Sequence, residues 1–196
     1  MKVLLGVTGS VAAIKLEKLV KELQKAGHEV QIVTTFSARY FQRKPVWNIV
    51  WQFIKAKFRI GKLQKIWGAR VWSDFDEWPG TKYRKGQEIP HIALRDWADA
   101  LLIAPCSANT LAKMANGICD NLLTCTVRAW DRKKKVIIAP AMNTKMWEHP
   151  ATDLHIEQLR EWYDLKVVQP VSKKLACGDE GMGALAPIEH IVQSVN

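Results

Sequence analysis

The sequence lacks any apolar run long enough to cross a bilayer. Apolar stretches such as 46–54 and 100–105 fall well short of the roughly 20 residues that a membrane-spanning helix needs. The first residues form too short an apolar stretch for a secretory signal, and no small-residue cleavage site follows. With 48% hydrophobic and 24% charged residues over 196 positions, the chain also lacks the composition of disordered or fibrous proteins. We therefore expect a single soluble domain in the cytoplasm.

Cysteine is scarce, and its spacing offers no metal site. The four cysteines are Cys106, Cys119, Cys125 and Cys177. They form no Cys-x-x-Cys pair, so we expect reduced thiols and no metal. The first three lie in apolar contexts and are interpreted as small buried hydrophobic residues. The sequence also lacks the full Gly-x-Gly-x-x-Gly fingerprint and the Walker lysine-serine pair of common nucleotide-binding loops.

Acidic residues are absent between Val30 and Ser73, where nine of the 29 cations lie. The remaining 20 cations face all 19 acids, so the net charge of +10 is local to this segment. Apolar residues recur there at three- and four-residue spacings, which predicts a basic amphipathic helix over about 45–67. Such a helix could lie on an anionic membrane, bind an acidic partner or cover the core of its own domain. Nucleic acid is disfavoured as a partner because no nucleic-acid-binding motif accompanies the segment.

Short apolar runs alternate with helical patterns along the chain. The run at 2–7, the helical pattern that follows Ser10 and the run at 29–34 form one β-α-β unit. Further strands are expected at 69–72, 100–104, 135–139 and 165–168, and helices at about 107–117, 121–130 and 151–163. This alternation predicts an α/β fold: a doubly wound, Rossmann-like parallel sheet of about six strands flanked by helices.

Ligands of such sheets bind at the carboxyl ends of the strands, so the loops found there are the candidate site. The four loops are 8–11, 34–37, 104–110 and 139–143. Several place a hydroxyl or an amide beside a helix start, where backbone N–H groups and the positive helix end attract a phosphate or a polar heterocycle. The pattern indicates a phosphorylated cofactor, although Ser10 could equally be a simple helix cap.

Four stretches read together resemble the homo-oligomeric flavin-containing cysteine decarboxylases. They are Gly6-Val-Thr-Gly-Ser-Val-Ala-Ala13, Pro90-His-Ile-Ala-Leu-Arg-Asp-Trp-Ala-Asp99 with the following 104–110, Pro140-Ala-Met-Asn-Thr-Lys-Met-Trp147, and Leu175-Ala-Cys-Gly-Asp-Glu-Gly-Met-Gly-Ala184. The third is similar to the family's Pro-x-Met-Asn-x-x-Met-Trp signature and the fourth to its substrate-covering clamp. The resemblance covers about residues 1–42 and 70–196, with the motifs in the family's order.

The resemblance implies FMN as cofactor and 4′-phospho-N-pantothenoylcysteine as substrate, decarboxylated to 4′-phosphopantetheine for coenzyme A synthesis. A carboxylate on a saturated carbon needs an electron sink before it can leave, and oxidation of the substrate thiol to a thioaldehyde provides one. The ene-thiolate left by CO2 is then reduced again. The implied FMN-binding residues are Gly9, Ser10, Val11, Thr35, Ser37, Ser107, Ala108, Asn109, Thr110 and Ala141.

By the same resemblance, three residues have roles in catalysis. His91 is implied to accept the thiol proton, Asn143 to bind the substrate carboxylate, and Cys177 to return a proton to the ene-thiolate. Asn143, Met146 and Ala176 are the implied substrate-binding residues, and Met142, Met146 and Trp147 shape the pocket or fill the core. Read without the resemblance, His91 could be a capping residue, Asn143 a turn residue and Cys177 a packed loop thiol.

The chain departs from the family pattern in the basic, Trp-rich segment. We interpret about 43–70 as an atypical insertion before Asp74-Phe-Asp-Glu-Trp78. Family members are typically trimers in which the adjacent chain contributes the histidine, and an exposed apolar stripe could extend the trimer to a larger assembly. Membrane-surface contact by this segment stays open.

Three other functions remain as alternatives to this decarboxylase. One is a non-catalytic, halotolerance-type regulator of a protein phosphatase, although the long acidic tail of those regulators is absent. Another is a related decarboxylase of peptide C-terminal cysteines. A flavin prenyltransferase is the third, but it would not need the clamp around Cys177.

Overall fold

The computed structural model describes residues 1–41, 64–78, 82, 85–174, 178 and 180–196. Its first unit follows the buried apolar runs of the sequence. Strand β1 (Lys2–Val7) leads through the 3-10 helix η1 (Val11–Lys15) and helix α1 (Leu16–Lys25) to strand β2 (Glu29–Thr34). Leu16, Leu19, Val20 and Leu23 form one buried stripe of α1, because three- and four-residue spacings return to the same side of a helix. The β-α-β unit expected from the sequence is therefore confirmed.

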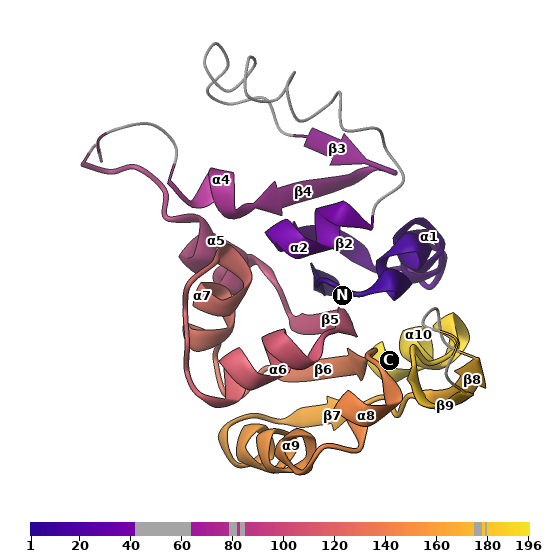
Figure 1. The fold of residues 1–196 in the computed structure, drawn as a ribbon. Coiled ribbons are helices and arrows are strands. Elements are labelled where there is room, and N and C mark those ends of the chain that lie inside the picture. The colour runs from indigo at the N-terminus through magenta and orange to yellow at the C-terminus, as the bar shows by residue number, and fades with distance from the viewer. Residues whose placement is uncertain (42–63, 79–81, 83–84, 175–177, 179) are drawn as a thin grey trace.

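A mostly parallel sheet forms the centre of the molecule (Figure 1). Its order is β3-β4-β2-β1-β5-β6-β7. The additional strands are β3 (Gln64–Ile66), β4 (Ala69–Ser73), β5 (Ala100–Cys106), β6 (Lys135–Pro140) and β7 (Leu165–Val167). Six of the seven strands are parallel, as the sequence predicted, and β3 pairs antiparallel to β4 at one edge.

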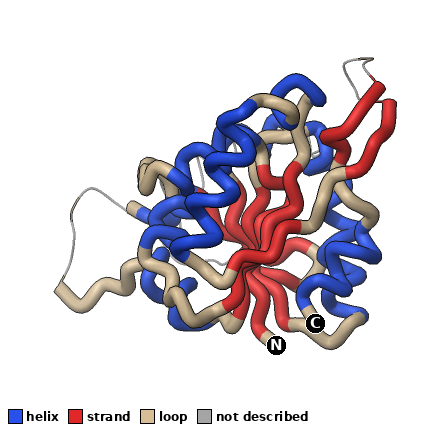
Figure 2. The backbone as a smooth tube through the Cα atoms, turned by 90° about the horizontal axis from the view of Figure 1, so that it is seen from below, coloured by secondary structure: helices blue, strands red, loops and turns tan. Residues whose placement is uncertain are grey.

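Helices cover both faces of the sheet (Figures 1 and 2). Helices α1 and α10 (Ile188–Val195) pack on one face. The other face carries α5 (Pro90–Trp97), α6 (Ala108–Ala115), α7 (Leu122–Arg128) and α9 (Pro150–Trp162). Because successive side chains of a strand point to opposite faces, Leu101 and Ile103 of β5 join one core while Leu102 and Ala104 join the other.

Short elements gather where the parallel strands end. They are α2 (Phe36–Tyr40), α4 (Asp74–Glu77), α8 (Thr144–Trp147) and a hairpin of β8 (Val171–Lys174) and β9 (Glu180–Ala184). The hairpin is fastened to the loop after β6, because Met142 N donates to Gly183 O at 2.9 Å. A side chain at position 183 would be impossible there, since its Cβ would lie 2.4 Å from Met142 O on a backbone with φ of +134°. The hairpin thus lies beside the candidate loops.

Most of the expected basic helix lies in residues 42–63, which are outside the described part of the chain. At the end of the expected helix, Gln64–Ile66 forms β3, so the prediction of a helix to residue 67 is wrong there. Ala69 and Arg70 belong to the sheet strand β4. Among the helices that the structure describes, none combines the length and apolarity needed to cross a bilayer.

We predict that Leu102→Ala lowers the free energy of unfolding by about 2–5 kcal/mol, because it opens a cavity in the central strand β5. Leu102 is fully buried. Urea denaturation measures the change. Leu154→Ala is the control: this leucine of α9 is 63% exposed, and its truncation should change stability by less than about 0.5 kcal/mol. Equal effects of the two variants would contradict the described packing.

Candidate active site

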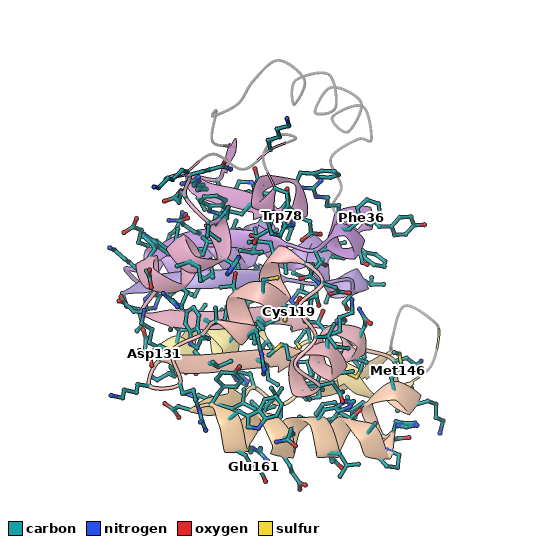
Figure 3. All side chains as sticks on the ribbon, turned by 90° about the vertical axis from the view of Figure 1, so that its left-hand side faces the viewer. Phe36, Trp78, Cys119, Asp131, Met146 and Glu161 are labelled. Carbon is teal, nitrogen blue, oxygen red and sulfur yellow. The ribbon has the colours of Figure 1, made fainter. Side chains whose placement is uncertain are left out.

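One cavity of about 780 Å³ opens at the carboxyl edge of the sheet. All four loops expected from the sequence contribute to its lining. Its volume lies within the range of pockets that hold a small molecule or cofactor. Phe36 of α2 and Met146 of α8 both line it, and Figure 3 shows these two side chains at the same edge of the molecule.

Polar side chains begin the helices around the cavity. Ser107 Oγ accepts a hydrogen bond from Thr110 N at 3.3 Å and starts α6. Ser10, Thr35 and Asn143 cap η1, α2 and α8 in the same way. These caps satisfy amide groups that the helices leave unpaired, and they hold each loop at a fixed angle. The alternative reading of Ser10 as a helix cap is therefore correct, and Ser10 lines the cavity as well.

The hydroxyl of Thr8 joins two of the loops. Thr8 Oγ1 donates to Pro105 O at 2.7 Å and accepts from Ser107 N at 2.8 Å. Thr8 is fully buried, so both bonds are shielded from water. These two hydrogen bonds consequently hold together the loop after β1 and the loop after β5, both of which line the cavity.

A glycine allows the loops after β1 and β2 to meet. A Cβ at position 9 would lie 2.5 Å from Ser37 Cβ, which is closer than real carbon atoms approach. Thr35 N also donates to Val7 O at 3.1 Å. The backbone of Gly9 therefore packs directly on the first turn of α2 and narrows this side of the cavity.

Cations outnumber acids among the described residues that line the cavity. These residues include Lys15, Lys113 and Lys173 as cations and Asp74 and Asp120 as acids. Lys113 forms an ion pair with Asp120, and this hydrogen-bonded ammonium lowers the pKa of the Asp120 carboxyl. Burial lowers the pKa of Lys15, and the positive charge of Lys173 lowers it further. Two lysines crowded against each other favour an anionic ligand at this mouth of the cavity.

Every residue that the sequence assigned to the cofactor lies in this one cavity. The set consists of Gly9, Ser10, Val11, Thr35, Ser37, Ser107, Ala108, Asn109, Thr110 and Ala141. Asn143 and Met146, expected to contact substrate, line the cavity too. Ala176 and Cys177 lie outside the described residues. The structure thus brings the expected residues together in one cavity. That they bind FMN and substrate stays a prediction.

His91 lies apart from the cavity of its own chain. It is the second residue of α5, after Pro90, and does not cap the helix, since Ile89 takes the cap position. Its Nδ1 contacts Oε1 of the buried Glu77, at the end of α4. The acidic element 74–78 is visible in the sequence, but its pairing with His91 was not predicted, because nothing in the spacing of the two residues marks them as neighbours.

Of the three cysteines expected to be small buried residues, Cys106 confirms the expectation, Cys119 contradicts it and Cys125 meets it only in part. Cys119 is exposed, because it follows the left-handed turn at Gly117 that ends α6 and leads away from the core. Cys106 is fully buried, and burial raises the pKa of its thiol to about 12, in keeping with an inert core residue. Cys125 is half-buried, and burial, reinforced by the nearby Glu77 carboxylate, raises its thiol pKa to about 11.

The three residues expected either to shape the pocket or to fill the core, Met142, Met146 and Trp147, divide between these two places. Met142 and Met146 line the cavity. Trp147 packs against the core cluster of the helix-rich face, to which Ile156 and Leu159 of α9 belong. Lys15 and Lys173 were not expected in the site. Lys15 follows the first loop motif in the sequence, whereas Lys173 reaches the cavity only through the hairpin.

An open parallel α/β sheet with one loop-lined cavity at its carboxyl edge defines the class of doubly wound, cofactor-binding proteins. The family model described as Flavoprotein matches residues 1–196. The chain therefore belongs to the Flavoprotein family. The matched range includes the basic segment and is wider than the stretches 1–42 and 70–196 on which the resemblance rested.

Individual relatives cover almost the whole chain. A mouse protein named phosphopantothenoylcysteine decarboxylase is 47% identical over 198 residues, covering 99% of this chain and 85% of its own. A cysteine-to-serine mutant of PPC decarboxylase, complexed with pantothenoylaminoethenethiol, is a structural neighbour with a TM-score of 0.82 and 41% identity, covering 99% of this chain and 95% of that one. The FMN binding protein AtHal3 has a TM-score of 0.79 and 42% identity, covering 99% and 94%.

We predict that Thr8→Val lowers the free energy of unfolding by about 1–3 kcal/mol, since it leaves buried partners in the loop after β5 without a hydrogen bond. Valine keeps the shape of threonine but lacks its hydroxyl. Chemical denaturation measures the change, and Thr8→Ser, which keeps the hydroxyl, is the matched control. Serine and valine variants of equal stability would show that the hydroxyl does not fasten the loops.

Proposed function

We propose that this chain is an FMN-dependent decarboxylase that converts 4′-phospho-N-pantothenoylcysteine to 4′-phosphopantetheine in coenzyme A synthesis. One observation carries the proposal: the residues expected to hold the cofactor, together with Asn143, line one cavity. The chain also shares 47% identity with the mouse enzyme, which supports a common reaction.

The cavity suits FMN in size and in chemistry. Its 780 Å³ accommodates a molecule of this kind, and its lining combines apolar side chains such as Val11 with the hydroxyls of Ser10, Ser37 and Thr110. The start of the eight-residue helix α6 contributes amide groups and a positive helix end, which suit a phosphate. The apolar part suits a flat ring system.

When bound, FMN would supply a two-electron oxidant for the substrate's thiol-bearing carbon and sulfur, and its reduced form would supply the same electrons again after decarboxylation. Oxidation turns the thiol into a thioaldehyde, whose C=S bond accepts the electron pair of the breaking carbon–carboxylate bond. CO2 leaves, and the product of that step is an ene-thiolate. Its reduction and protonation restore a thiol, so the overall reaction consumes no external oxidant.

Three side chains would move protons and orient the substrate. His91 would take the thiol proton, and Asn143 would hold the substrate carboxylate beside the cavity floor. Asn143 lies in the loop after β6, and its Oδ1 accepts a hydrogen bond from Lys145 N at 2.9 Å, which makes it a stable anchor. Cys177 would return a proton to the ene-thiolate, with Met146 and Ala176 contacting the substrate.

The position of His91 supports an oligomer, because this residue lies outside the cavity of its own chain. A neighbouring copy could complete the site, and we propose a trimer or an assembly of trimers. We further propose that the chain forms one flavin-binding domain that acts in the cytoplasm. The basic segment at about 43–70 stays a predicted insertion.

Purified protein is predicted to be yellow and to release CO2 from the phosphopantothenoyl substrate. Flavin absorbance measures the cofactor, and trapping of labelled CO2 measures the reaction. Protein that holds FMN but releases no CO2 would reject this substrate and favour the regulatory alternative.

Two variants separate the proposed proton transfers. Cys177→Ser should let the oxidised, decarboxylated intermediate accumulate, whereas His91→Asn should stop the reaction before CO2 is lost. Mass spectrometry of the reaction mixture distinguishes these outcomes. Identical product patterns in the two variants would contradict the assigned roles.

A further inference from the structure

Three acidic residues follow β4, and each makes a different contact. Asp76 Oδ2 accepts hydrogen bonds from Ser73 N and Ser73 Oγ, both at 2.7 Å, and so caps α4. Asp74 Oδ1 accepts from Leu122 N at 3.0 Å and joins α4 to the first turn of α7. Glu77, in contrast, turns inward, and its Oε1 meets His91 Nδ1 on α5. The first two carboxylates build the local fold, whereas the third contacts an imidazole.

The burial of Glu77 is costly for the fold. Its side chain is only 3% exposed, and within the described part of the chain its Oε2 has no hydrogen-bond partner. A buried carboxylate loses much of its hydration energy, and one ion-pair partner rarely restores all of it. An apolar residue could pack among α4, α5 and α7 without this penalty. Stability therefore gives no reason for a carboxylate at this position.

The contact with Glu77 determines which nitrogen of the His91 imidazole carries the proton. An ionised carboxylate has only acceptor atoms, so the N–H of a neutral His91 ring must lie on Nδ1. The other nitrogen, Nε2, then carries a lone pair and can accept a proton. When Nε2 takes that proton, the ring becomes positive, and the buried negative charge of Glu77 stabilises it. His91 remains 23% exposed in its side chain, so the ring can still reach another molecule.

We propose that Glu77 is a positioning residue, which holds His91 in the tautomer and orientation that make Nε2 the proton acceptor of the reaction. The inference rests on the proposed function, because it assigns Glu77 a part in the same proton transfer. Glu77 itself is not among the residues that line the cavity. It acts only through the imidazole of His91 in the same chain. This role is the same whether His91 serves the cavity of its own chain or that of a neighbouring copy.

The test uses the full-length, FMN-loaded protein and Glu77→Gln. Glutamine keeps the size of glutamate, but its NH2 group can donate to Nδ1 and so allows the opposite tautomer. We expect kcat to fall by about 10²-fold or more, with a much smaller change in KM, as for other carboxylate–histidine pairs. FMN content should match that of the unmodified protein.

The decisive readout is the tautomer of His91, from ¹⁵N NMR of histidine-labelled protein at a pH where the ring is neutral. The chain has five histidines, so the signal is assigned by its loss in His91→Asn. The unmodified protein should show a protonated Nδ1, and Glu77→Gln should shift population toward a protonated Nε2. A protonated Nε2 in the unmodified protein would overturn the proposal without any variant.

Asp76→Asn is the matched control, because Asp76 lies in the same short helix but its carboxylate caps α4 through Ser73, whereas the carboxylate of Glu77 contacts His91. It should lower the thermal midpoint while leaving kcat and the tautomer unchanged. If Glu77→Gln instead keeps full kcat, or loses activity only in proportion to lost FMN, Glu77 is merely structural. If the unmodified protein releases no CO2, the proposed function fails, and the tautomer measurement still decides the pairing.

Discussion

The candidate site depends on the parallel register of β1 with its two neighbours. Val7 lies opposite Thr34 of β2, and Gly6 lies opposite Ile103 of β5, so the three strands end at one edge. Parallel strands cannot be joined by tight hairpins, and the connecting chain must cross a face of the sheet before it returns. The loops that begin these crossings therefore converge, and Thr8 fastens two of them through Pro105 O at 2.7 Å.

Close backbone contacts then shape the cavity around this register. Gly9 packs on Ser37 of α2, and Gly183 packs on the loop after β6, at distances that exclude any side chain. The second contact brings in the β8–β9 hairpin, which lies outside the main sheet and carries Lys173 to the cavity. In the sequence, Cys177 lies between the two strands of this hairpin. A wall of the site is thus supplied by an element that the parallel sheet alone would not place there.

Much of the fold followed from local patterns in the sequence. The alternation of short apolar runs with helical patterns predicted a parallel sheet of about six strands, because parallel neighbours are joined by crossover connections that are usually helices. The strand β3 was missed, since three residues such as Gln64–Ile66 carry no measurable period and owe their structure to pairing with β4. Cys119 was placed in the core because its neighbours are apolar, yet the turn at Gly117 directs it outward.

The sequence by itself determined where strands give way to helices and which hydroxyl and amide groups begin those helices, because capping is a contact between near neighbours in the chain. Only the tertiary structure decided which side chains from separate elements meet. Glu77 and His91 are 14 residues apart and lie on different helices. Lys15 and Lys173 are still farther apart in the sequence, and their mutual repulsion exists only because the hairpin brings Lys173 near Lys15. Such contacts follow from long-range packing, which no local spacing encodes.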